Sequence, residues 1–137
     1  MDIEMIIYNA LIADSYIVEQ VSGRIKFYDY PESANVDNPF IIIDPLDVPN
    51  PSDLADDTWL TYDCLYQIEV WTKSRAITKK LGEKVHQVMW NLGFRQNGGL
   101  SEYENSIFRD ARRFRGKLYR EDFEEITKSI SLNKRSD

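Results

Sequence analysis

Histidine and cysteine, which often act as nucleophiles, general bases or metal ligands, are scarce in this sequence. Its 23 acidic residues leave a carboxylate pair for acid–base chemistry and weak cation binding as alternatives, but nothing in the sequence places them in a pocket. The chain has one histidine, His86, and one cysteine, Cys64. A single histidine excludes a His-pair zinc site and argues against a Ser-His-Asp triad. A single cysteine excludes an internal disulfide and any multi-cysteine metal site. We therefore expect no catalytic residue, no metal and no cofactor, and we interpret the chain as a protein without enzymatic activity.

The glycine-rich and acidic segments lack the motifs of phosphate-binding, nucleophile-elbow and calcium sites, which supports the same interpretation. Gly98 and Gly99 lack the flanking pattern of a phosphate-binding loop, and no nucleophile-elbow motif is present. The acidic stretch at 44–57 lacks the ligand spacing of a calcium loop and contains prolines. His86 precedes Trp90 by four residues beside an apolar stripe, so we expect a half-buried packing histidine. Cys64 lies on the apolar side of a predicted strand and is expected to be buried and inert.

The most distinctive local feature is a cluster of five cations in nine residues. It comprises Arg109, Arg112, Arg113, Arg115 and Lys117. On a strand these side chains alternate, so Arg112 would oppose the other four. Three interpretations stay open: pairing with the chain's own acidic residues, contact with the acidic segment 46–58 of a neighbouring subunit, or a strand that binds nucleic acid.

A second feature is the acidic segment at 46–58, which also contains Pro49 and Pro51. The segment is interpreted as a long loop that is mobile in the free subunit, because it has many charges and few large apolar groups. It is a candidate for contact with a neighbouring subunit or another protein. Its candidate contact residues are Asp47, Asp53, Asp56 and Asp57.

Two helices and four strands are predicted to position these residues. The helices cover 2–13, capped by Asp2, and 74–92, where apolar residues recur every three to four positions before Gly93. The strands are predicted from short apolar or alternating patterns at 24–30, 40–43, 59–72 and 106–119.

Other segments give weaker signals. Asp14 and Ser15 are expected to interrupt the first helix before a short turn at 16–21, and 97–99 is expected to be a turn. Gly116 is expected to mark a bulge. Residues 121–132 fit an edge strand or a helix, and the strand is favoured.

Consecutive strands without intervening helices indicate antiparallel hairpins. The order predicts an α+β, two-layer sandwich with a mainly antiparallel sheet of four to five strands and two main helices on one face. The other sheet face would be exposed or would meet another subunit. The 137 residues suit one domain, at 1–133, followed by a flexible tail at 134–137. No apolar run exceeds four residues, so no membrane partner is expected.

Charge is distributed unevenly along the chain. The net charge of −6 divides into −12 for residues 1–72 and +6 for residues 73–137. If the halves occupy different sides of the fold, acidic and basic faces would favour head-to-tail association of copies. If the sheet mixes the halves, the asymmetry averages out.

The chain resembles a family of phage proteins along residues 3–119. The similarity lies in the opening helix and strand at 7–14 and 21–25, the segment 67–71 before a helix, and the segments 93–96 and 111–116. These patterns are similar to tail completion proteins, or tail terminators, of long-tailed siphovirus-type phages and prophages of Gram-positive bacteria.

This resemblance implies a structural role at the tail–head junction of the virion, after assembly in the host cytoplasm. Such proteins form a ring, commonly a hexamer, on the head-proximal end of the tail tube. The ring stops tube growth and provides the surface that joins the head. The implied partners are other copies of the chain, the major tail tube protein and a head-neck connector protein, with DNA only in transit through the channel. We expect the ring to form at high protein concentration or on the tail. Because such rings can close only on the tube, the isolated protein can be a monomer at lower concentration.

Two other functions remain as alternatives. One is a neck protein, a head-completion or stopper ring at the portal. The other is a small nucleic-acid-binding module that uses the cations between Arg109 and Lys117, although a sequence pI near 4.8 disfavours general nucleic-acid binding.

Overall fold

The structure, a computed structural model, describes residues 2–31 and 35–119. The predictions for residues 121–132 and for the tail at 134–137 lie outside these ranges. The described elements, in chain order, are α1 (Ile3–Ile12), α2 (Ser15–Val21), β1 (Ile25–Phe27), β2 (Phe40–Pro45), β3 (Asn50–Ala55), β4 (Thr58–Thr72), α3 (Arg75–Asn91), β5 (Phe94–Glu104) and β6 (Ile107–Tyr119).

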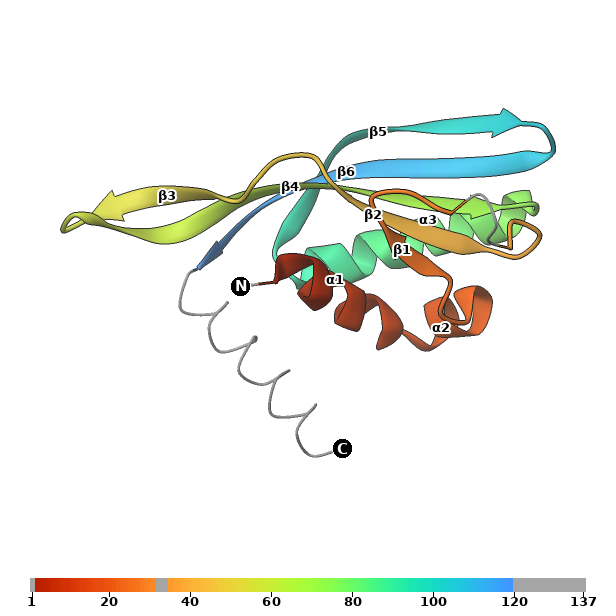
Figure 1. Cartoon of the computed structure of the whole chain (residues 1–137), viewed down its shortest axis with the longest axis horizontal. Coiled ribbons are helices and arrows are strands. Elements are labelled where there is room, and N and C mark those ends of the chain that lie inside the picture. Colours follow the sequence, from red (N-terminus) through yellow and green to blue (C-terminus); the bar gives the residue numbers. More distant parts are fainter. Residues whose placement is uncertain (1, 32–34, 120–137) are drawn as a thin grey trace.

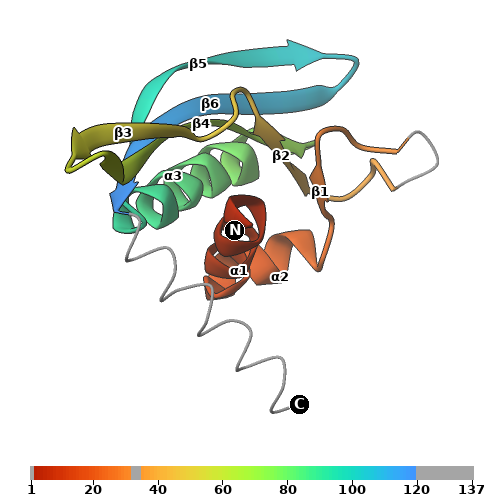
Figure 2. The same ribbon diagram turned by 60° about the vertical axis from the view of Figure 1, so that its left-hand side comes forward.

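The strands form one mixed sheet, and the helices cover one of its faces (Figures 1 and 2). The main order is β1-β2-β4-β6-β5, and β3 pairs with β4 on the edge that β4 also shares with β2. Neighbouring strands are antiparallel except for β1 and β2, which run parallel. The predicted two-layer α+β fold is therefore confirmed.

The described sheet has six strands, where the sequence predicted four to five. One additional strand, β3, comes from the predicted acidic loop at 46–58. Asn50 pairs with Asp63 and Ala55 pairs with Thr58, so the second half of this segment forms a hairpin with β4. The prediction of one long loop was wrong because pairing along β4 makes a strand of a segment that has no apolar pattern of its own. The mobility of this segment in the free subunit stays a prediction.

The other additional strand is β5, which begins at Phe94 and runs through the expected turn at 97–99. The pairing of β5 with β6 shifts between Gln96 and Gly99, so these residues form an irregularity inside the strand. Gly99 has φ of +153°, and a Cβ atom there would lie 2.4 Å from the carbonyl oxygen of Ala111. Glycine therefore permits close backbone approach at this point without ending the strand.

A third helix, α2, also differs from the prediction of two main helices. The Asp14 side chain accepts a hydrogen bond from the backbone N–H of Ile17 at 3.0 Å. Asp14 therefore caps a new helix where the sequence was interpreted as a break before a short turn. Asp2 and Ser74 cap α1 and α3 in the same way, as the sequence predicted for Asp2.

The core lies between the sheet and the three helices. The apolar stripe of α3 buries Leu81, Val85 and Met89 against the sheet. His86 is half-buried beside this stripe, and its ring lies 6.3 Å from those of Trp90 and Phe114, as the packing interpretation predicted. No helix within the described ranges is both long enough and apolar enough to cross a lipid bilayer.

Gly116 makes room for an aromatic ring instead of forming the predicted bulge. The pairing of β4 with β6 continues without a shift through Cys64 and Gly116. A Cβ atom at Gly116 would lie 2.7 Å from the ring of Phe94, which is fully buried and packs edge-on against Tyr66. The glycine therefore lets the first residue of β5 enter the core.

The buried thiol of Cys64 is expected to be unreactive in the folded protein. Burial, reinforced by the charges of Asp63 and Glu4, raises the pKa of Cys64 from 9.0 to about 12. At about pH 8 the thiolate population should therefore be lowered about a thousandfold. A colorimetric thiol reagent should react at least that much more slowly with the native chain than with the chain in concentrated guanidinium chloride. Similar rates in the two states would contradict the described burial.

Candidate functional site: the outer face of the sheet

The sheet face opposite the helices carries most of the predicted cation cluster. Even-numbered residues of β6, such as Phe114, point into the core, so odd-numbered residues point outward. Arg109, Arg113, Arg115 and Lys117 therefore share the outer face, as the alternation predicted. This face also carries outward-pointing polar residues of β4, to which β6 is paired along its length.

The contact between Arg109 and Glu69 is the most buried charge pair of this face. Nε and Nη2 of Arg109 both lie 2.6 Å from Oε1 of Glu69. Only 7% of Glu69 is exposed, and the guanidinium carbon of Arg109 also lies 5.1 Å from the centre of the Trp71 ring. Glu102 of β5 contacts the same arginine at 3.3 Å. The arginine thus covers a carboxylate that would otherwise be buried without a counter-charge.

Two further arginines continue this row along β4. Nε of Arg113 donates to the side-chain oxygen of Gln67 at 3.2 Å, and Nη1 of Arg115 lies 3.2 Å from the carboxylate of Asp63. The ion pair with Asp63 is much more exposed than that with Glu69, since half of the Arg115 side chain is accessible. It should therefore contribute little to folding.

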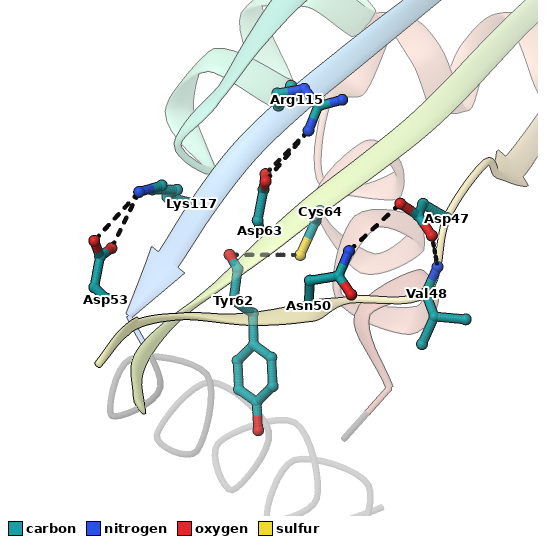
Figure 3. A network of polar contacts seen from close by, with 9 residues as sticks. All are labelled: Asp47, Val48, Asn50, Asp53, Tyr62, Asp63, Cys64, Arg115 and Lys117. Carbon is teal, nitrogen blue, oxygen red and sulfur yellow. Dashed lines mark hydrogen bonds and ion pairs between the residues drawn. The ribbon is translucent and has the colours of Figure 1, made fainter. Parts of the chain in front are cut away.

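Lys117 ends the row at the base of the β3–β4 hairpin (Figure 3). Its Nζ lies 3.2 Å from the carboxylate of Asp53, which also accepts a hydrogen bond from the Thr61 hydroxyl at 2.7 Å. The Thr61 hydrogen bond, with that of Lys117, holds the pKa of Asp53 below its usual value. One predicted pairing between the cation cluster and the acidic segment is thus present, but within a single chain.

Arg112 points to the helix side of the sheet, again as the alternation predicted. Its Nε and Nη2 donate to the two carboxylate oxygens of Asp110 at 2.9 and 3.1 Å, and Nη1 donates to Gln96 at 3.3 Å. Gly82 of α3 lies against this pair, where a Cβ atom would be 2.6 Å from Asp110. The Arg112 pair thus lies between sheet and helix.

All five cations of the cluster therefore have partners within the chain, which supports the intramolecular interpretation of their local role. The other acidic candidates lie apart from them. Asp47 accepts hydrogen bonds from Val48 and Asn50 before β3 begins (Figure 3). Asp56 and Asp57 form the exposed two-residue turn between Ala55 and Thr58. No cation within the described ranges forms an ion pair with these three carboxylates.

The residues of β4 that receive the arginines were not among the predicted site residues. Gln67 and Glu69 lie on the polar face of the strand, yet they are buried under the long side chains of β6. The signal was present in the alternation, because outward carboxylates at Asp63 and Glu69 match the outward cations of the neighbouring strand. Pairing these charges from the sequence would require knowing that β4 and β6 are adjacent, which the sequence does not specify.

The outer face holds charged groups of β4 and β6 in fixed positions through the ion pairs described above. The described residues contain no group of three or more side chains suited to hold a metal ion. The arrangement can present a fixed charge pattern to another macromolecule.

Comparisons with known proteins identify a shared fold. No protein-family model matches this sequence, and no curated protein matches it. Among solved structures, the chain is similar to one from the "Virion of native gene transfer agent (GTA) particle", with a TM-score of 0.59 and 16% sequence identity. The match covers 82% of this chain and 91% of that chain.

Proposed function

We propose that this chain is a structural protein of a phage or prophage virion that caps the head-proximal end of the tail tube as a ring. The cap would stop tube growth and provide the surface to which the filled head attaches. Its partners would be other copies of the chain, commonly six in all, together with the tail tube protein and a connector protein of the neck. DNA would meet the ring only in transit through its channel.

The observation that carries this proposal is the shared fold with a chain from a virion particle, which extends over most of both chains. The sequence resemblance to tail terminators extends over residues 3–119 of this chain. The two comparisons rest on different data, one on backbone arrangement and the other on local residue patterns. Agreement between them favours virion assembly over other uses of a small α+β fold.

The outer face supports a binding role for this protein. A sheet face held by ion pairs is a rigid surface on which copies of the chain or other proteins can dock. The exposed charged side chains on it can leave their partners within the chain for a bound protein at low cost in free energy. We propose that the cluster from Arg109 to Lys117 and the acidic residues Asp47, Asp53, Asp56 and Asp57 contribute to contacts in the assembled particle. A nucleic-acid-binding role is less favoured, because carboxylates already neutralise four of the five cations.

Labelling particles with an antibody against this chain tests its location. We expect the label at one end of tails that assemble in a mutant lacking heads, because a cap binds a completed tube before the head arrives. In intact particles the label should lie at the head–tail junction. A virion protein unrelated to the junction, such as the major tail tube protein, serves as the control and should label the whole tube.

The same experiment separates a tail cap from a neck protein. A neck protein would label heads that assemble without tails and would be absent from free tails. Label on neither structure would contradict a role at the junction altogether.

A further inference from the structure

The long axis of the molecule separates an acidic end from a basic helix face. Strand β4 extends from Thr58, beside the hairpin turn, to Thr72, and α3 starts after the cap at Ser74 (Figure 1). The 15 residues of β4 span about 46 Å at about 3.3 Å per residue. The hairpin turn and the start of α3 therefore lie at opposite ends of one rigid strand.

The hairpin end is acidic and partly apolar. Residues 27–72 contain no lysine, arginine or histidine, and the turn itself exposes the carboxylates of Asp56 and Asp57. Two leucines flank this turn, with 80% of Leu54 and 48% of Leu60 accessible. Leu54 pairs with Trp59, so the two leucines lie on opposite faces of the hairpin. An exposed leucine beside uncompensated negative charge suits a partner that offers cations next to an apolar group.

The exposed face of α3 offers such cations. Arg75, Lys79 and Lys80 lie in its first two turns, and no residue in the described ranges forms an ion pair with them. Lys80 covers the ring of Tyr16 from α2 at 4.4 Å, so an aromatic surface adjoins the charges. The first turn of α3 has no acidic residue, so Arg75 stands at the positive end of the helix dipole without a counter-charge. This local arrangement is unfavourable in the isolated chain and becomes favourable when an acidic group binds.

We propose that the hairpin turn of one copy, carrying Asp56 and Asp57, docks on the basic face of α3 of the next copy, at Arg75, Lys79 and Lys80. This inference rests on the proposed function, to which it adds the two surfaces that join neighbours. Each copy has one of each surface, at opposite ends, so the contact repeats head to tail and closes into a ring when the rotation allows. The cations of β6 are already paired within the chain, whereas those of α3 remain available.

Two variants remove the contact while preserving the fold. In D56N/D57G the turn loses both charges and gains the Asn-Gly pair that suits its positive φ angles of 49° and 59°. In R75E/K79E the start of α3 gains an acidic residue, which the helix dipole favours. Neither substitution is expected to destabilise the monomer, and thermal unfolding checks this directly.

Sedimentation velocity of the purified full chain at millimolar protein and low salt measures the association. We expect the wild type to associate reversibly and each variant to raise the dissociation constant about tenfold or more, since D56N/D57G removes two negative charges and R75E/K79E reverses two positive ones. Added salt should weaken the wild-type contact. The matched control K26E/R95E changes the net charge as R75E/K79E does, but on β1 and β5, and should associate like the wild type.

A mixing experiment tests the pairing of the two surfaces. A chain with A55K/D56N/D57G has a cationic turn and a normal α3, whereas R75E/K79E has a normal turn and an acidic α3. Alone, neither should associate, but an equimolar mixture should recover association because both contacts are then complementary. A wild type that stays monomeric, a control that also fails, or a mixture without recovery would overturn the docking of these surfaces. These association results do not determine where the antibody against the chain labels the particle, so the proposed function is tested separately.

Discussion

Particles made without this chain are expected to separate into filled heads and unjoined tails. A tube that grows by adding identical subunits has no internal stop, so under the proposed capping role tails without this chain should be overlong or unstable. Head filling should be normal, because a cap on the tail tube would take no part in packaging DNA into the head. Deleting the gene and counting joined particles by electron microscopy measures this effect, which should be a nearly complete loss of tailed virions.

The deletion needs a control that separates loss of the chain from a polar effect on neighbouring genes. Expression of the wild-type chain from a plasmid should restore joined particles and normal tail length. Normal tailed virions in the deletion strain would contradict a role at the tail end.

Replacing Arg109 with methionine should cause the largest loss of stability on the outer face. The change leaves the Glu69 carboxylate, of which 7% is exposed, without its main cation. Breaking a buried pair by removing one partner typically costs about 3 kcal/mol, and the partial exposure of Arg109 lowers our expectation to about 2 kcal/mol. Urea unfolding followed by circular dichroism measures the change in the free energy of unfolding.

The matched control is Arg115→Met on the same strand and face. Its ion pair with Asp63 is exposed, so the expected loss is at most about 0.5 kcal/mol. The double variant R109M/E69M should recover much of the loss, because no buried charge is then left without a partner. If the R109M and R115M variants lost equal free energy of unfolding, the burial of Glu69 would not determine how much the pair of Arg109 and Glu69 contributes to stability.

The strongly patterned elements could be predicted from the sequence. The apolar stripe of α3 and the alternation of β4 and β6 each specify a face, so their positions and orientations agree with the structure. Elements without such a pattern were missed. Strand β3 contains Pro51 and has almost no buried side chain, and β5 buries only Phe94, so both depend on pairing with a long neighbour.

The candidate site shows the same division. Alternation predicted correctly that Arg112 opposes the other cations of the cluster, because side-chain direction follows from strand parity alone. The partners of those cations depend on which strands are adjacent and in which register. Glu69 meets Arg109 only because β6 pairs with β4 in the observed register, and single-sequence periodicity contains no such information.

The most direct test of a capping role is the dose of purified chain that restores head joining in an extract from the deletion strain. A cap acts by binding, so restoration should increase with added chain and saturate when the number of rings matches the number of tails. An extract with twice as many tails should need twice as much chain. Restoration at doses far below the number of tails, or none at any dose, would contradict the proposal that this chain is a stoichiometric cap of the tail tube.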